Sequence, residues 1–187
     1  HYSQFLMPTI RGSELGSKKR YAGLKITTGG DELVFKGLET VRSDWTQLAK
    51  NFQLTLYKMV FGEQNVDAYL LQIIEDTRSG KLDEQLVYHK RIRRKLELYV
   101  KNVPPHVKAA RLADQQNKLL GKKLRYQHKS WISYVISING PEPVEYLSSQ
   151  IDYEHYVDKQ IKPIAEGILP FIGLSFEDIT SQQMGLF

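Results

Sequence analysis

The chain has 187 residues, of which 41% are hydrophobic and 25% charged, and its formal net charge is +5. This composition supplies a buried core for one or two domains and excludes a disordered chain, while the lack of cysteine excludes a disulfide framework. No apolar run reaches 18 residues and no signal pattern follows His1, so we expect a cytoplasmic protein without a membrane span. Because the chain starts at His1 rather than Met, we expect an internal piece of a longer protein.

The first predicted elements form a β-hairpin. Residues 18–26 and 33–36 are short strand-like runs, and residues 27–31 between them contain two glycines. Glycine adopts the positive φ that tight hairpin turns require, so this spacing favours two antiparallel strands.

Two helices are predicted next. Asp44 with Gln47 three residues later resembles a capping box, and it precedes an apolar stripe at helical spacing that extends to Met59. A second helix is predicted over 66–77, ending near Gly80, because glycine commonly follows the last helical residue.

Basic residues concentrate in the middle of the chain. Residues 81–130 contain fourteen lysines and arginines against four acidic residues, whereas the rest contains twelve basic and seventeen acidic residues. A local charge of +10 attracts polyanions, and lysine and arginine contacts to phosphate dominate nucleic-acid affinity. The alternatives are a solvated basic face or a patch for an acidic protein.

Within this basic segment, Tyr88, Ile92, Leu96 and Tyr99 have helical spacing. A helix over 88–99 would place four cations away from this apolar stripe. We expect these cations to reach outward: Lys90 and Arg94 opposite the stripe, with Arg91 and Arg93 flanking it.

Three further elements complete the chain. A helix is predicted over 106–120, opened by Pro104-Pro105 and ended by Gly121. Residues 131–138 have the strongest strand pattern, with Asn139-Gly140-Pro141 after them. Asp152 is a candidate cap for a last helix that reaches about residue 169, bent or divided at Pro163. The expected fold class is α+β and helix-rich.

The chain lacks the motifs of several enzyme classes. Its five histidines are scattered, there is no phosphate-binding glycine loop, and there is no nucleophile elbow. The adjacent carboxylates at 31–32, 83–84 and 177–178 lie in polar turns or helix starts, where neighbouring side chains diverge. We therefore expect no catalytic residue and no bound metal in this chain.

Several stretches together resemble one family. Residues 17–24 read S-K-K-R-Y-A-G-L, and residues 36–45 read K-G-L-E-T-V-R-S-D-W. They resemble the K-x-Y stretch and the G-L-E-x-V-R-x-D-W segment in the palm of family B DNA polymerases, the bacterial members in particular. Further stretches resemble successive thumb segments of that family: 86–90, 105–107, 109–110, 132–136, 152–156 and 163–169. The resemblance spans essentially the whole chain in the family's order.

The resemblance implies a role for the first hairpin. Lys19 and Tyr21 correspond to the K-x-Y pair that faces the minor groove of primer-template duplex near the primer end, beside Lys18 and Arg20. A lysine donor there can reach acceptors that every base pair presents, so it senses pairing without reading sequence. The alternative is that Tyr21 packs in the hairpin while the cations are solvated.

The remaining cations are expected to hold the duplex backbone, because phosphate contacts are indifferent to base identity. The resulting candidate DNA-binding residues are Lys18, Lys19, Arg20, Tyr21, Lys90, Arg91, Arg93, Arg94, Lys108 and Arg111, with Lys122, Lys123 and Arg125 as weaker candidates. Arg42 and Asp44 also match the family, but capping favours a structural role for Asp44, and Arg42 has the alternative of pairing nearby.

The C-terminal residues resemble the peptide by which bacterial polymerases dock on the sliding clamp. Gln183 would be the hydrogen-bonding anchor, and Met184, Leu186 and Phe187 would fill an apolar pocket. Met replaces the usual Leu at nearly equal volume. The alternative is a tail that folds back or is disordered.

The resemblance implies the C-terminal part of a DNA-directed DNA polymerase used in replication and repair. Residues 1–62 would be the end of the palm with its hairpin and helix, 63–180 the thumb, and 181–187 the clamp-binding tail. The catalytic aspartates, and the Mg²⁺ of the full-length enzyme, would belong to sequence upstream, so this chain alone would be inactive. The alternative is a stand-alone, non-catalytic basic adaptor that binds RNA or DNA.

Overall fold

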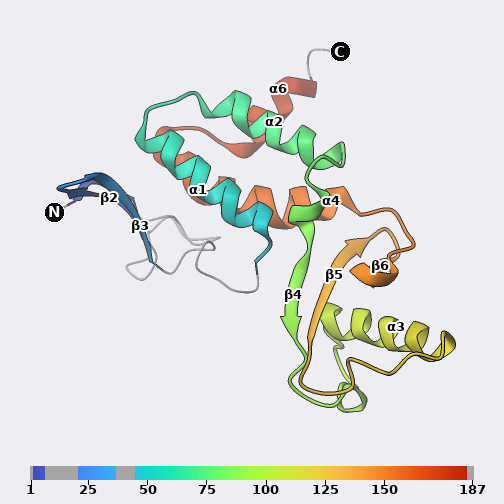
Figure 1. Ribbon diagram of the computed structural model, residues 1–187. Helices are drawn as coiled ribbons and strands as arrows, with labels where there is room; N and C mark the ends of the chain where they lie inside the picture. Colours follow the sequence, from blue (N-terminus) through green and yellow to red (C-terminus); the bar gives the residue numbers. More distant parts are fainter. Residues whose placement is uncertain (1, 7–20, 37–44, 185–187) are drawn as a thin grey trace. The chain divides into compact units, whose positions relative to one another are not determined.

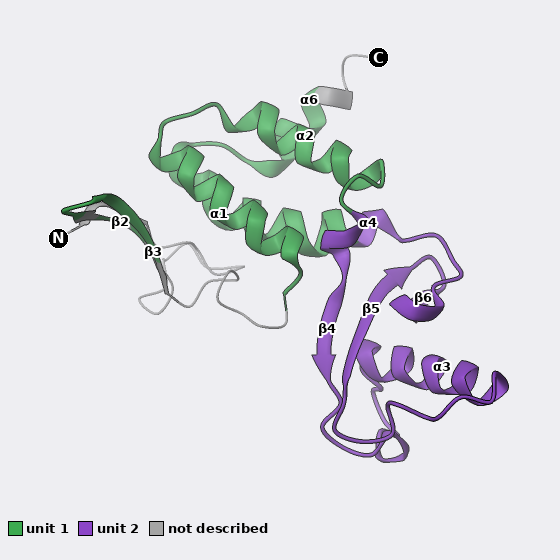
Figure 2. Cartoon of the chain, viewed as in Figure 1, with its two compact units in different colours: residues 1–82, 156–187 green, residues 83–155 purple. Residues whose placement is uncertain are grey.

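The computed structural model describes residues 2–6, 21–36 and 45–184 (Figure 1). The chain divides into two compact units (Figure 2). The first contains residues 1–82 and 156–187, and the second contains residues 83–155.

A three-stranded antiparallel sheet opens the first unit. Its strands are β1 (Tyr2–Leu6), β2 (Tyr21–Thr27) and β3 (Gly30–Lys36), in the order β1-β2-β3. The register pairs Thr27 with Gly30, and Gly30 has a φ of 116°, a conformation that side chains with a Cβ rarely adopt. The predicted hairpin is therefore confirmed, whereas β1 was not predicted.

Helices α1 (Gln47–Phe61) and α2 (Val66–Arg78) follow. The stripe predicted for α1 is buried, with Leu48, Phe52 and Leu56 at most 1% exposed. The helix begins with Thr46 as its cap, because the Thr46 hydroxyl accepts a hydrogen bond from the Ala49 amide at 3.3 Å. The predicted capping box from Asp44 to Gln47 is wrong in its boundary, and Asp44 lies outside the described residues.

The last helical stretch is divided, as the position of Pro163 predicted. It contains α4 (Tyr153–Tyr156), a π-helical segment (Val157–Ile161), α5 (Lys162–Ile168) and a 3₁₀ turn (Leu169–Ile172). Helix α6 (Phe176–Met184) follows and was not predicted. Asp152 accepts a hydrogen bond from the His155 amide at 3.3 Å, consistent with the predicted cap. Segments α5 and 157–161 pack on α1, where Thr46 donates a hydrogen bond to Gln160.

The second unit is a three-stranded sheet with one long helix. Strands β4 (Tyr88–Arg91), β5 (Trp131–Ser137) and β6 (Gly140–Pro143) are antiparallel in the order β4-β5-β6, and α3 (Pro105–Leu119) packs on β5 and β6 (Figure 1). Short 3₁₀ turns occupy Asp83–Leu86, Leu96–Leu98 and Val144–Tyr146. The buried core between helix and sheet contains Ile92, Leu96, Val107, Ala109, Ala110, Ala113, Tyr126, Ile132 and Tyr134.

The helix predicted over 88–99 is wrong. Residues 88–91 form a strand, and only 96–98 are helical, in a single 3₁₀ turn. Ile92 and Leu96 are buried as predicted, but Tyr88 contributes by stacking on Tyr134 across the strands at 5.1 Å. The spacing of the apolar residues suggested a helix, but a strand followed by a 3₁₀ turn buries Ile92 and Leu96 equally well.

The expected fold class is confirmed: the described chain is α+β, and helical residues outnumber strand residues. The predicted strand over 131–138 ends one residue earlier, and Ile138 is 63% exposed rather than on the buried face. Gly140-Pro141 does not end the sheet, because these residues begin β6 after a tight turn.

Candidate nucleic-acid interface

The open end of the β4–β5 pair carries a cationic and aromatic face. Arg91 pairs with Trp131 in the antiparallel register, so their side chains are cross-strand neighbours on one side of the sheet. Ile92 and Ile132 follow them and are at most 1% exposed, because successive side chains point to opposite faces. The solvent side is thus fixed by two buried isoleucines.

A shallow pocket of about 370 Å³ lies at this end of the pair. We call it the Trp131 pocket, and it is lined by Arg91, Arg93, Lys129 and Trp131. The three cationic side chains are exposed, and Trp131 is 64% exposed. Among the described residues, no carboxylate lies within ion-pair distance of these three cations.

The other two predicted cations near β4 have different surroundings. Lys90 is two positions from Tyr88 on β4, and thus on the opposite side of the strand from Arg91. The pKa of His106 on α3 is lowered first by burial and second by the charge of Lys90. The Arg94 guanidinium lies over the Tyr99 ring, 4.4 Å from its centroid. The predicted cations therefore do not form the single helical face that was expected.

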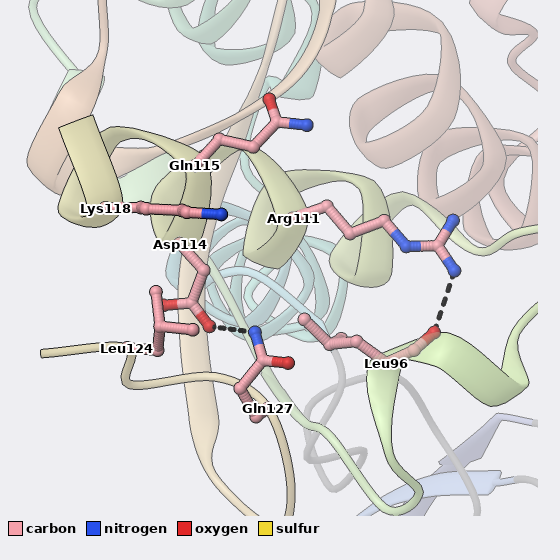
Figure 3. A pocket seen from close by; sticks show the side chains of 7 residues that line it. All are labelled: Leu96, Arg111, Asp114, Gln115, Lys118, Leu124 and Gln127. Carbon is pink, nitrogen blue, oxygen red and sulfur yellow. Dashed lines mark hydrogen bonds between the residues drawn. The ribbon is translucent and has the colours of Figure 1, made fainter.

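Asp114 on α3 holds the basic loop that follows the helix. Its carboxylate accepts hydrogen bonds from the amides of Arg125 and Tyr126 at 2.8 and 3.0 Å. The Gln127 side chain donates a further bond at 2.7 Å, drawn in Figure 3. Burial raises the pKa of Asp114, but these bonds and one from Asn117 outweigh it and lower the pKa below its ordinary value. An ionised carboxylate thus fixes the path of residues 125–127.

Arg111 has a structural contact that sequence analysis did not predict. Its Nη2 donates a hydrogen bond to the Leu96 carbonyl oxygen at 2.7 Å, drawn in Figure 3. The same Nη2 donates to the Tyr99 carbonyl oxygen at 2.6 Å. The side chain therefore braces the 3₁₀ turn that follows Arg93 and Arg94. Its DNA contact stays a prediction.

The remaining candidates on α3 and its loop differ in their partners. Lys108 is exposed on α3. Arg125 forms an ion pair with Glu145 at 3.1 Å, and Lys122 lies 6.0 Å from the centroid of the Tyr146 ring. Such contacts weaken the case for Arg125 relative to Lys108, because a paired cation has a competing anion.

Some predicted site residues cannot be placed. Lys18, Lys19 and Arg20 lie outside the described residues, and Tyr21 begins β2 without a described side chain. Gln183 and Met184 form the end of α6, while Leu186 and Phe187 lie outside the described residues.

Sequence analysis missed two members of the Trp131 pocket. Trp131 was assigned only to a strand, and Lys129 was counted only in the local charge. The residue types were visible in the sequence, since an aromatic ring within a basic segment can combine base stacking with phosphate contacts. The sequence did not reveal that Arg91 pairs with Trp131 across the two strands.

Two features of other kinds of site are absent from the described residues. They contain no cluster of three histidines or carboxylates suited to a metal ion. None of their helices is both long and apolar enough to cross a membrane.

The comparisons with known proteins identify the class. A family model described as DNA polymerase family B matches residues 13–171, and the chain belongs to that family. The chain is 52% identical over its full length to DNA polymerase II of Escherichia coli, of which it covers 24%. It is 34% identical over 170 residues to DNA polymerase 2 of Aeropyrum pernix, covering 85% of this chain and 20% of that protein. The expected family resemblance is confirmed, and the chain spans about a quarter or less of these relatives.

Proposed function

We propose that this chain is the part of a bacterial DNA-directed DNA polymerase that grips primer-template duplex and tethers the enzyme to the sliding clamp. The observation that carries the proposal is family membership over 13–171, which includes the whole basic segment. The proposed division is palm end at 1–62, thumb at 63–180 and tail at 181–187. These proposed parts differ from the two compact units, whose boundaries lie near residues 82 and 155, because compact units are defined by packing and the proposed parts by function.

Nucleotidyl transfer in the whole enzyme would use Mg²⁺ to activate the primer hydroxyl and to neutralise charge on the leaving pyrophosphate. The described residues do not offer carboxylates clustered to hold it. The metal-binding aspartates therefore belong, in this proposal, to the part of the relatives that the chain does not span. This chain contributes binding and positioning, which set the effective concentration of the reacting ends.

Exposed cations would contact the duplex backbone. Lys90, Arg94 and Lys108 have their side chains at the surface of the second unit, and Arg91 and Arg93 lie at the end of β4. Contacts of this kind release counterions, so the affinity falls steeply with salt and does not depend on sequence. Lys19 and Tyr21 would face the minor groove near the primer end.

The tail would dock on the clamp through Gln183, Met184, Leu186 and Phe187. Helix α6 includes Gln183 and Met184, while Leu186 and Phe187 lie outside the described residues. A short apolar peptide bound in a groove of a ring-shaped partner raises the effective concentration of the enzyme on DNA.

Fluorescence anisotropy with a labelled primer-template duplex over a salt series tests the DNA-binding proposal. The double variant Lys90→Ala/Lys108→Ala should weaken duplex binding roughly tenfold at low salt. The slope of log affinity against log salt should become shallower by about 2, the loss of two phosphate contacts. The matched control Lys58→Ala/Lys159→Ala removes two exposed lysines of the first unit. Equal weakening in both variants, or preference for RNA over duplex DNA, would favour the alternative of a general basic adaptor.

Calorimetric titration of the chain into purified bacterial sliding clamp tests the tail. Binding should be lost in Gln183→Ala/Phe187→Ala and kept in Ser181→Ala, which changes a polar side chain of the tail that is not one of its four proposed contacts. Unchanged binding in the first variant would rule out this tether without affecting the DNA proposal.

A further inference from the structure

We propose that the Trp131 pocket binds an unpaired nucleotide of single-stranded DNA, with its base stacked on Trp131 and its phosphates held by Arg91, Arg93 and Lys129. The inference deepens the proposed function by naming a second DNA form recognised by the same unit. It rests on the proposal that the chain binds DNA.

The first step of the argument is the exposure of the indole. Trp131 is 64% exposed at the end of β5, although its strand neighbour Ile132 is 1% exposed. A large aromatic ring left in water offers an apolar face that the core does not use. Base faces are free to stack on such a ring in single strands, whereas a duplex buries them between neighbouring pairs.

The second step is the arrangement of charge around the ring. Arg91 is the cross-strand partner of Trp131, Lys129 precedes it by two residues, and Arg93 lines the same pocket. Within the described part of the chain, none of the three cations is engaged in an ion pair. Cations that surround a stacking ring bind the phosphates flanking the stacked base, which gives affinity without sequence preference.

The third step is that the backbone around the pocket is fixed by local contacts. The Ile92 amide donates a hydrogen bond to the Ser130 carbonyl at 2.7 Å, which ties the chain after β4 to the residue before Trp131. Lys129 has a φ of 50°, so its backbone turns tightly into β5. On the same face, the His89 and Ser133 side chains are hydrogen-bonded at 2.7 Å. A preformed pocket loses less conformational entropy on binding.

Trp131 fluorescence tests the inference directly. The chain contains two tryptophans, so a Trp45→Phe background isolates the signal of Trp131. Titration with an oligothymidylate of about twelve nucleotides should quench this signal, because a stacked base quenches indole emission. A blunt duplex of the same length should bind by anisotropy but quench this signal much less, because its bases are already stacked on their neighbours.

Variants separate stacking from charge. Trp131→Ala should weaken oligothymidylate binding roughly 5- to 150-fold, the range of one stacked base, and leave duplex binding within about twofold. Trp131→Phe should keep much of the affinity because it keeps an aromatic face. Leu119→Ala, at an 81% exposed apolar position of α3, is the matched control and should change neither.

The outcomes distinguish this inference from the proposed function. Absence of quenching by the single strand, or equal weakening of both DNA forms in Trp131→Ala, overturns the inference and leaves duplex gripping intact. Quenching by oligothymidylate without any duplex binding supports the pocket and overturns the duplex proposal. Circular dichroism on each variant confirms that the exposed substitutions leave the fold unchanged.

Discussion

In the helical part of the first unit, residues 45–82 and 156–184, the buried polar side chains are neutral, among them Thr46, Gln53 and Gln160. The second unit instead buries two carboxylates, Asp114 and Glu142, at 4% and 6% exposure. Each carboxylate accepts several hydrogen bonds from loops that follow it in the chain. Both units bury apolar side chains, and the contrast indicates that the second unit adds ionised anchors that order its loops.

Phe52→Ala is expected to have the largest effect. Phe52 is 1% exposed on α1 and stacks on Tyr69 of α2 at 5.9 Å, so its removal leaves a cavity between the helices. The cost is about 3 to 5 kcal/mol of unfolding free energy. Hydrogen exchange followed by mass spectrometry should show faster exchange in α1 and α2 than in 83–155. An equal increase in exchange rate in both units would contradict the expectation that Phe52 stabilises the first unit alone.

Asp114→Ala should act on the other unit. The substitution leaves the Arg125 and Tyr126 amides without their carboxylate acceptor, a cost of about 2 to 4 kcal/mol. Faster exchange should be concentrated in residues 122–130 and α3. Asp114→Asn keeps one carbonyl acceptor and should be less damaging. If the alanine variant exchanged like the parent chain, the carboxylate would not be the anchor of this loop.

Thr46→Ala sharpens the comparison at a neutral polar group. It removes the cap of α1 and the hydrogen bond to Gln160, with an expected cost of about 1 to 2 kcal/mol. Thr46→Ser keeps the hydroxyl and should restore most of the stability. Urea denaturation at about pH 7 and pH 4 should give the same loss at both values, because neither partner titrates in that range.

Glu142→Gln replaces the second buried carboxylate by a neutral amide that keeps one carbonyl acceptor, and its effect should depend on pH. Burial raises the pKa of Glu142, but hydrogen bonds from Ser137, Ser148 and Ser149 outweigh it and lower the pKa to about 2. A carboxylate with a lowered folded-state pKa contributes stability above its ordinary pKa, here 4.5, and loses it as the pH falls towards 2. The parent chain should therefore lose stability on acidification more steeply than the Gln variant, as measured by thermal unfolding from about pH 6 to pH 3. Parallel curves would show that Glu142 is not linked to the acid sensitivity.

Local signals predicted much of this fold. Apolar periodicity and terminal residues located α1, α2 and α3, and two glycines located the β2–β3 turn. The failure at 88–99 has a physical reason, because the strand depends on pairing with residues 131–134 about 40 positions away. Periodicity reports which side chains are buried, and it cannot report a non-local hydrogen-bonding partner.

The candidate site divides in the same way. Arg91 and Arg93 were predicted from local charge, whereas Trp131 and Lys129 became part of the site only through the β4–β5 register. Arg111 shows the opposite case, since its charge suggested DNA while its carbonyl partners lie in a turn 12 and 15 residues earlier. The charge of an arginine in the sequence does not distinguish a side chain that stabilises a turn from one that binds DNA.

The π-helical segment Val157–Ile161 constrains how the chain tolerates changes in length. The Lys162 amide donates to the Val157 carbonyl five residues earlier, so this turn holds one residue more than an α-helical turn. Deleting one residue here would restore α-helical bonding but rotate everything after it by about 100° about the helix axis. Ile164 and Ile168, now 4% and 1% exposed, would turn away from the core. Relatives of this chain should therefore keep the spacing between Tyr156 and Ile164, even where the amino acids between them differ.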